Sequence, residues 1–275
     1  MARILMCPPE FYGIEYEINP WMSRQRPSDR AVAQQQWENL RNILSNAGAE
    51  IHLQPAISGL PDLVFTANAA LIFRGQAILA RFKHEQRQGE TPHDETWFRS
   101  AGFQTQHPPA GVFFEGAGDA LFCGETLFAG YRMRSDARGH QQIGELLGVR
   151  VIPLELVNDY YYHLDTCFCP LAPDVAIYFP DAFDEYGRQA LAAQVRELIP
   201  VTENEARRFA CNAVVVGRTV VTNSGCPELH RTLAKRDFRP VETPLDEFVK
   251  SGGSAKCLTL RIDGEEAASW KYGSS

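Results

Sequence analysis

The amino-acid sequence predicts an α/β propeller, a closed ring of units that each contain two strands, a helix and a third strand. Two observations lead to this fold class: the even spacing of four hairpin turns, and a unit at the two chain ends that lacks one strand. Four β-hairpin turns recur at nearly even intervals, at Arg74-Gly75, Gly124-Glu125, Pro173-Asp174 and Gly217-Arg218. Their repeat of roughly 45 to 50 residues is typical of propellers and solenoids. A ring of such units would bring the start of every hairpin to one central axis.

Each turn joins two apolar runs that are expected to pair as antiparallel strands. These hairpins cover residues 69–80, 120–131, 167–179 and 213–222. A helix is expected after each hairpin, over residues 94–101, 136–147, 182–198 and 227–235. A short third strand, such as residues 149–153, follows the helix and completes the unit.

The two ends of the chain predict how the ring closes. Residues 3–7, 29–47 and 50–54 are expected to form a strand, a helix and a strand, so this unit lacks one strand. Residues 256–262 could supply it, which would close a ring of five units and remove an exposed sheet edge. Because no linker-like stretch divides the chain, we expect one domain over residues 1–265 and a polar tail over residues 266–275.

Composition excludes several classes of protein. The 275 residues are 44% hydrophobic and 22% charged, which is typical of a chain with a packed core. A net charge of −7 with no basic block argues against a nucleic-acid partner. No apolar run has the length of a membrane span. The seven dispersed cysteines do not suggest a disulfide framework, so we expect free thiols and a cytoplasmic location.

A polar residue precedes each of the four hairpins, and a cysteine lies near the start of the strand that would close the ring. These residues are Asn68, Glu115, His163, Asn212 and Cys257. A nucleophile and a base can meet in space although they lie far apart in sequence, so Asn68, Glu115, His163 and Cys257 form a candidate catalytic set. Taken alone, each residue has an ordinary interpretation: a buried thiol, a packed histidine, a solvated carboxylate or a turn asparagine.

Local motifs around these residues strengthen the catalytic interpretation. They are Phe65-Thr-Ala-Asn68, Phe114-Glu-Gly-Ala-Gly-Asp119, Tyr162-His-Leu-Asp-Thr166 and Gly252-Gly-Ser-Ala-Lys-Cys257. In this order they resemble the guanidine-modifying enzymes of the pentein superfamily, over nearly the whole chain. The resemblance implies a five-bladed α/β propeller, in agreement with the ring inferred from turn spacing. Ile18-Asn-Pro-Trp-Met22 and residues 163–171 resemble the arginine dihydrolase branch, which converts arginine to ornithine, carbon dioxide and two ammonia.

The resemblance implies a catalytic role for three residues. Cys257 would attack the central carbon of the guanidinium as a thiolate. His163 would donate a proton to the departing ammonia and accept one from the attacking water. Glu115 and Asp165 would hold guanidinium N–H groups by charge-assisted hydrogen bonds, and Glu115 could also orient His163.

Other residues would select and orient the substrate. Related arginine deiminases carry an aspartate at the position of Asn68, whereas an amide can both donate and accept, which would retain citrulline for a second hydrolysis. Asn19 would be a second amide in the same pocket. Arg87 and Arg134 would bind the α-carboxylate, with Arg81 and Arg132 as nearby competitors.

Several alternatives stay open at this stage. A deiminase or dimethylargininase would stop at citrulline, an amidinotransferase would need an acceptor, and a non-enzymatic pentein would only bind. Cys167 and Cys169 alternate along one strand, so they are not expected to share a metal, and no cofactor is implied. The expected partner is L-arginine or a close derivative. Homo-oligomer formation and fusion to a further enzyme domain are left undecided.

Overall fold

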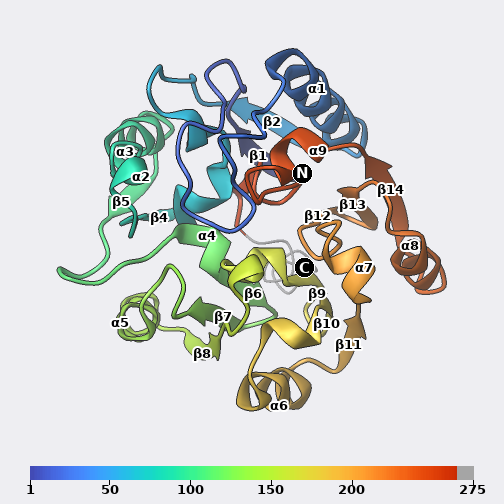
Figure 1. Cartoon of the computed structure of the whole chain (residues 1–275). Coiled ribbons are helices and arrows are strands. Elements are labelled where there is room, and N and C mark those ends of the chain that lie inside the picture. The colour runs from blue at the N-terminus through green and yellow to red at the C-terminus, as the bar shows by residue number, and fades with distance from the viewer. Residues whose placement is uncertain (265–275) are drawn as a thin grey trace.

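The computed structural model describes residues 1–264 and shows five three-stranded sheets arranged around a common centre (Figure 1). The ring of five strand-strand-helix-strand units predicted from turn spacing is thus confirmed. The predicted polar tail, residues 266–275, lies outside the described residues.

Four of the sheets are each formed by three strands that are consecutive in the sequence, and each contains one predicted hairpin. In every one, the first two strands are antiparallel and the third is parallel to the second. The strands are β3 (Ala70–Phe73), β4 (Gln76–Leu79) and β5 (Gln104–Gln106); β6 (Ala120–Cys123), β7 (Thr126–Tyr131) and β8 (Arg150–Glu155); β9 (Phe168–Ala172), β10 (Val175–Tyr178) and β11 (Glu197–Pro200); and β12 (Val214–Val216), β13 (Thr219–Asn223) and β14 (Arg239–Thr243).

The fifth sheet joins the two ends of the described chain, as predicted. β15 (Leu260–Arg261) pairs antiparallel with β1 (Arg3–Met6), which pairs parallel with β2 (Glu50–Leu53). The last strand is shorter than the predicted 256–262, and that prediction was wrong for residues 256–259 and for residue 262. The backbone there turns, because the N–H of Cys257 bonds to the side chain of Asn212 and the N–H of Leu258 bonds back to Ser254.

Long helices cover the outside of the ring (Figure 1). They are α1 (Arg30–Asn46), α3 (Thr91–Ser100), α5 (Ala137–Leu147), α6 (Glu185–Gln194) and α8 (Pro227–Ala234). Shorter helices are α2 (Glu85–Gln88), α4 (Gly116–Asp119), α7 (Glu203–Ala206) and α9 (Asp246–Val249). Within residues 1–264, no helix is long and apolar enough to cross a membrane.

Helix ends follow the capping residues rather than the predicted limits. Asp29 caps α1 by accepting from the N–H groups of Ala31 and Val32. The predicted helix over 182–198 is only Glu185–Gln194, because Asp184 caps its start and β11 already begins at Glu197.

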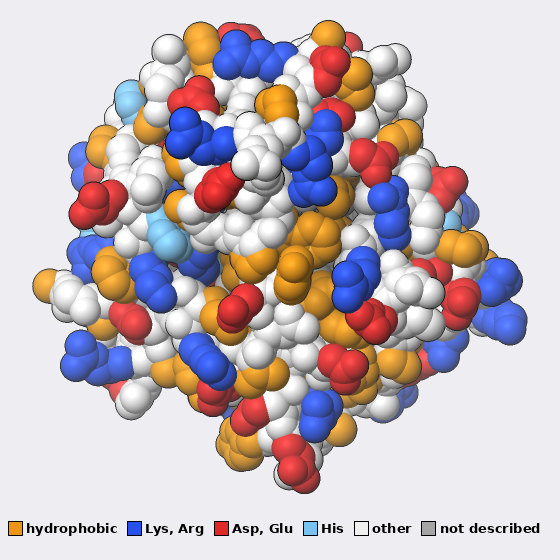
Figure 2. All heavy atoms as spheres, viewed as in Figure 1, with side chains coloured by type: hydrophobic (Ala, Val, Ile, Leu, Met, Phe, Trp, Pro, Cys, Tyr) orange, Lys and Arg blue, Asp and Glu red, His pale blue; other side chains and the backbone are white. Residues whose placement is uncertain are grey.

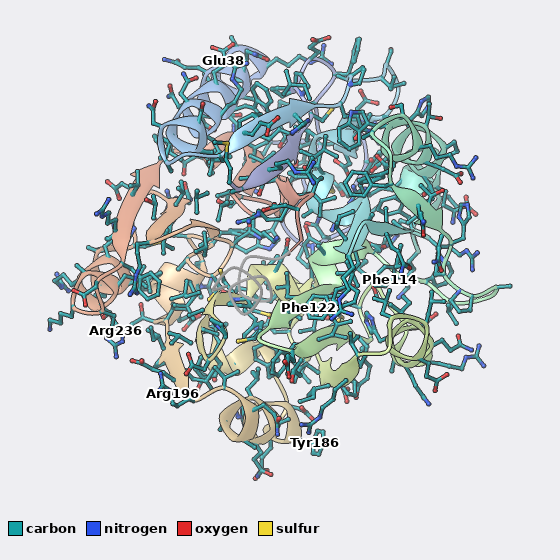
Figure 3. The ribbon with its side chains drawn as sticks, turned by 180° about the vertical axis from the view of Figure 1, so that it is seen from behind. Glu38, Phe114, Phe122, Tyr186, Arg196 and Arg236 are labelled. Atoms are coloured by element: carbon teal, nitrogen blue, oxygen red, sulfur yellow. The ribbon has the colours of Figure 1, made fainter. Side chains whose placement is uncertain are left out.

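The core lies between the helices and the sheets. Figure 3 shows Phe114 and Phe122 in the interior, whereas Tyr186, Arg196 and Arg236 lie on the outer rim. Both phenylalanines are buried, and Tyr186 is 69% exposed. All seven cysteines are buried thiols that form no disulfide with one another, as the sequence predicted. This buried core holds in place the short segments that precede the first strand of each hairpin.

Candidate active site

The five units each contribute one buried polar side chain to the centre of the ring. Four come from the starts of hairpins and one from the turn before β15. Asn68 ends the 3₁₀ helix Thr66–Asn68, Glu115 precedes α4, His163 precedes the 3₁₀ helix Leu164–Thr166, Asn212 lies before β12, and Cys257 lies before β15. The even spacing in sequence therefore corresponds to a common position in the fold.

Three of these side chains, Asn68, His163 and Cys257, line a small cavity with about 280 Å³ of space between atoms, while Glu115 and Asn212 contact His163 and Cys257 without lining it. Figure 2 shows that hydrophobic side chains gather near the centre of the face seen in Figure 1, with charged side chains around them. Six predicted site residues line the cavity: Asn19, Asn68, Arg87, Arg134, His163 and Cys257. Glu115 and Asp165, the other two, are buried and hydrogen-bond to His163 and Cys257. The structure thus brings all eight together.

The two competing arginines do not line this cavity. Arg81 donates to the carbonyl of Val112 at 3.4 Å and so supports a loop. Arg132 forms a half-exposed ion pair with Glu155, with 3.0 Å between nitrogen and oxygen. Arg87 and Arg134 are therefore the arginines available to a bound molecule.

Cys257 has two polar neighbours at its sulfur. The Nδ2 of Asn212 lies 3.1 Å from Sγ, and Oδ2 of Asp165 lies 3.4 Å from it. Burial, followed by the charge of Asp165, holds the pKa of the thiol well above its ordinary value. Without a bound cation, Cys257 is therefore a thiol rather than a thiolate.

His163 and Glu115 form a buried pair with 2.7 Å between Nε2 and Oε2. Burial alone would raise the pKa of Glu115, but Arg134, 3.1 Å away, and His163 bring that pKa below its usual range. An ionised carboxylate only accepts, so the hydrogen is assigned to Nε2 from this contact, and Nδ1 is the basic nitrogen. Burial lowers the pKa of His163 to about 4, which leaves the ring neutral at pH 7.

Arg87 is held by a bidentate hydrogen bond to Glu90, a contact that was not predicted from the sequence. Its Nε and Nη2 donate to the two carboxylate oxygens of Glu90 at 2.8 and 2.7 Å. Its Nη1 donates to Oδ1 of Asn68 at 2.8 Å. An arginine cannot accept a hydrogen bond, so this contact fixes the amide oxygen of Asn68 towards Arg87. The pair at positions 87 and 90 was visible as an i,i+3 ion pair.

Arg134 and Asn19 connect the cavity to the segment that follows β1. Nη2 of Arg134 donates to the carbonyl of Ile18 at 3.1 Å, and its guanidinium lies 4.6 Å from the ring centre of Tyr162. The amide of Asn19 bonds to backbone: Nδ2 donates to Ser251, and Oδ1 accepts from Trp21. In this structure Asn19 thus holds the wall of the cavity in place.

Two glycines in the predicted motifs allow close packing at the site. A Cβ atom at Gly118 would lie 2.1 Å from Nδ2 of Asn68, and one at Gly253 would lie 2.6 Å from the ring of Phe65. Neither contact is sterically allowed. Glycine is needed at these positions because other parts of the chain occupy the space of a side chain.

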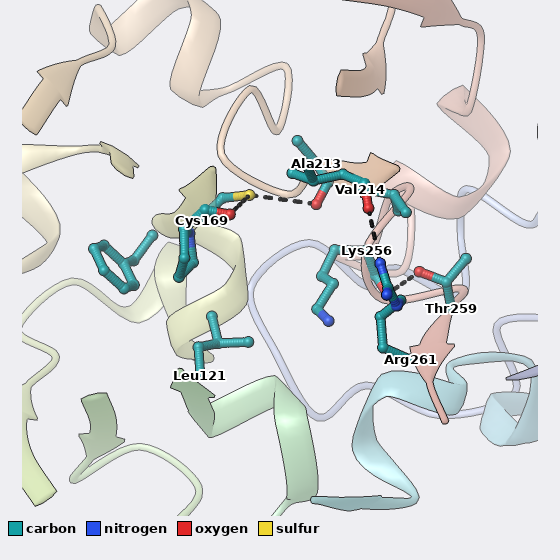
Figure 4. Close-up of a pocket in the computed structure, with 10 residues that line it drawn as sticks. Leu121, Cys169, Ala213, Val214, Lys256, Thr259 and Arg261 are labelled. Atoms are coloured by element: carbon teal, nitrogen blue, oxygen red, sulfur yellow. Dashed lines mark hydrogen bonds between the residues drawn. The ribbon is translucent and has the colours of Figure 1, made fainter. Parts of the chain in front are cut away.

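A second cavity, with about 430 Å³ between atoms, lies beside β6, β9 and β12. Figure 4 shows Lys256, Thr259 and Arg261 lining it together with Leu121 and Cys169. Consecutive residues thus face different cavities, since Lys256 lines this one and Cys257 lines the first. Within residues 1–264, no histidine or carboxylate lines the second cavity, so the first is the better candidate for catalysis.

A five-bladed α/β propeller with a buried cysteine, histidine and glutamate at its centre is the architecture of the pentein class. Within that class, the chain belongs to the N,N-dimethylarginine dimethylhydrolase family, whose eukaryotic model matches residues 17–263.

Comparison with individual proteins gives two kinds of relatives. The chain is 43% identical over 267 residues to the bifunctional arginine dihydrolase/ornithine cyclodeaminase ArgZ of Synechocystis sp., covering 94% of this chain and 37% of ArgZ. It is 40% identical over 263 residues to the N(G),N(G)-dimethylarginine dimethylaminohydrolase of Mycobacterium tuberculosis, covering 94% of this chain and 85% of that protein. The chain therefore spans little more than a third of the bifunctional relative.

A solved structure supports the same assignment of fold. The N-terminal domain of ArgZ, described as an arginine dihydrolase of the ornithine-ammonia cycle in cyanobacteria and bound to substrate, superposes with a TM-score of 0.93. The two sequences are 42% identical, and the match covers 96% of this chain and 99% of that domain.

Proposed function

We propose that the chain is a cofactor-independent arginine dihydrolase that converts L-arginine and two waters to L-ornithine, carbon dioxide and two ammonia. The observation that carries this proposal is Asn68 at the cavity, with its oxygen fixed towards Arg87. Likeness to the dihydrolase domain of ArgZ supports it. We expect the enzyme to act in the cytoplasm, where its seven buried thiols stay reduced.

The first half of the reaction uses Cys257, His163 and the carboxylates. The sulfur attacks the guanidinium carbon and forms a C–S bond, and the C–N bond to one terminal nitrogen breaks to release ammonia. The ring of His163 is neutral in the resting enzyme, so it has no extra proton to give. It first accepts the proton of the thiol and then donates that proton to the departing ammonia. Water then attacks the carbon, His163 accepts its proton, and the C–S bond breaks to give citrulline.

A cationic substrate is needed to start this sequence. Burial and Asp165 favour the protonated thiol in the free enzyme. A guanidinium bound between Asp165 and Glu115 would neutralise that negative field and lower the pKa of Cys257. The thiolate would then form where an electrophile is already in place, which limits unwanted oxidation or alkylation.

Asn68 supplies the argument for a second hydrolysis. An NH₂ group carries two donors, and Nδ2 uses one in a long contact of 3.5 Å to the carbonyl of Glu115. A second donor suits the neutral ureido oxygen of citrulline, which an aspartate at this position would repel. Citrulline retained in this way would meet Cys257 again: the sulfur would attack the ureido carbon, and a second C–N bond would break to release the second ammonia. A second water would then break the C–S bond, and loss of carbon dioxide would leave ornithine.

One specific observation favours a different function. The matching family model and the mycobacterial relative carry the name of enzymes acting on dimethylarginine. A dimethylarginine hydrolase would use the same thiol and histidine but release dimethylamine and stop at citrulline.

The test is incubation of the purified protein with isotopically labelled arginine, or with dimethylarginine, followed by mass spectrometry of the products. We expect ornithine and two ammonia per arginine, and a loss of activity on the order of 10⁴-fold or more in Cys257→Ser. Citrulline with one ammonia would overturn the two-step reaction. Turnover of dimethylarginine alone would assign the chain to the second function.

A further inference from the structure

Asn212 is the one member of the five central side chains to which the proposed mechanism gives no role. It lies just before β12, is fully buried, and its side chain bonds to the segments carrying Cys257 and Asp165. Its position in the unit of β12, β13 and β14 matches those of Asn68, Glu115 and His163 in theirs. A buried amide at this place requires a physical explanation.

The oxygen of the amide fixes the turn that carries the nucleophile. Oδ1 of Asn212 accepts from the backbone N–H of Cys257 and from that of Ser254, both at 3.1 Å. The backbone carbonyl of Asn212 also accepts from the N–H of Lys256 at 3.1 Å. Three hydrogen bonds from one residue therefore hold residues 254–257 against the start of β12.

The same two contacts determine which way the amide faces. Backbone N–H groups only donate, so the oxygen must face Ser254 and Cys257, and the NH₂ group must face the opposite side. There, Nδ2 donates to the carbonyl of Asp165 at 3.0 Å and lies 3.1 Å from Sγ of Cys257. Asn212 therefore presents an N–H donor to the sulfur.

We propose that Asn212 is a catalytic residue that stabilises the negative charge on the sulfur of Cys257 through this N–H donor. The proposal rests on the proposed function, in which the sulfur becomes a thiolate at attack and again at each release. A donor fixed before the reaction costs no reorganisation when the charge appears. It also counteracts the neighbouring carboxylate of Asp165, which opposes that charge.

Other charged and titratable groups face the same cavity and are held constant in the test. They are Asp62, Arg87, Arg134, Tyr162 and His163, with Asp165 beside the sulfur. Asp165 is in direct contact with Sγ, so its carboxylate must stay in place in every variant compared. The effect of Asn212 is therefore measured as a difference between variants that share all of these groups.

The experiment measures how fast iodoacetamide alkylates Cys257 as a function of pH, by mass spectrometry of its peptide. In Asn212→Ala we expect the pKa obtained from this profile to rise by about one to two units, because a hydrogen bond to a charged group is lost. We expect kcat for arginine to fall about 100-fold. The alkylation readout needs no substrate, so it stays valid if the proposed function fails.

Two further variants make the result decisive. Asn212→Asp keeps an oxygen for the two backbone N–H groups but removes the donor, so it should fold and raise the same pKa even further. Asn223→Asp is the matched control, because Asn223 is a buried asparagine of the same unit that bonds to the backbone of Arg208 and Leu245. It should leave the alkylation profile unchanged. The proposal would be overturned if Asn212→Ala folds and has the wild-type alkylation profile. If Asn212→Ala does not fold, a wild-type profile in Asn212→Asp would overturn it.

Discussion

The neutral forms of the titratable groups are favoured at one end of the cavity, and a charged form is favoured at the other. The reaction end contains Cys257 and His163, and burial moves both towards their neutral forms. The anchor end contains Arg87, Glu90 and Asn68. There, burial opposes the charge on Arg87, but Glu90, followed by Asp62, keeps its pKa well above the ordinary value. Both ends are buried, so burial alone does not decide whether a group is charged.

The difference between the ends comes from the partners that each group has. A bidentate carboxylate compensates the cost of burying a guanidinium, which cannot lose its proton in any case. A thiol and an imidazole can avoid that cost by staying neutral. The anchor end therefore offers a permanent charge for binding, and the reaction end offers groups that can exchange protons.

Asn68→Asp would break this division most strongly, because it places a carboxylate between Arg87 and the reacting carbon. The new carboxylate is expected to pair with Arg87, so the variant should fold. The neutral ureido group would lose its donor, and ornithine formation should fall about 100-fold while citrulline accumulates. The ratio of the two products, measured by mass spectrometry, checks this. An unchanged ratio would remove Asn68 from the account of the second hydrolysis.

Arg87→Lys would weaken the anchor end alone. A lysine keeps the charge but loses the bidentate hydrogen bond to Glu90, so we expect KM for arginine to rise about 10- to 100-fold with kcat changed less than about threefold. Steady-state kinetics separate the two constants. Arg132→Lys is the control, because Arg132 is half exposed and bonds to Glu155 outside the cavity. A large fall in kcat with unchanged KM would place Arg87 at the reaction end instead.

His140→Phe would test whether a buried neutral histidine has consequences outside the site. Burial lowers the pKa of His140 to about 4, as it does for His163, but His140 bonds to the carbonyl of Gly130 and packs against Phe114. Its folded pKa lies below the unfolded value. The stability that it contributes is therefore present above a pH of about 6.5 and is lost as the pH falls towards about 4.

Unfolding in urea at pH 7 and pH 5 measures this contribution. The loss of unfolding free energy between the two pH values should be about 2 kcal/mol smaller in His140→Phe than in the wild type. Activity at pH 7 should stay within about twofold. An equal loss of stability in both proteins would show that His140 does not titrate as its burial indicates.

Much of the fold could be predicted because hairpin turns and apolar runs are local signals. The five units, the closing strand and the outer helices follow from them. The turn at Cys257 could not be predicted, since it depends on the side chain of Asn212, which is 45 positions away. Apolar residues around Cys257 fit a strand equally well, and a contact in space decided between the two.

The candidate site shows the same limit. Motif residues such as His163 and Cys257 could be selected from sequence because their local contexts are distinctive. The even spacing of Asn212 was visible too, but spacing says nothing about which atom faces the sulfur. Asn19 lines the cavity as expected, although its amide is bonded to backbone, a detail that depends on the path of the surrounding loop.

The pairing of β15 with β1 also determines when the protein can become active. Cys257 lies directly before the strand that is last along the described chain, and that strand pairs with the first. Contacts between such distant residues form late and slowly in folding. A ribosome-bound chain can already contain Glu115 and His163, but the thiol meets them only when the ring closes. A nascent chain that has not yet reached β15 therefore lacks an assembled site.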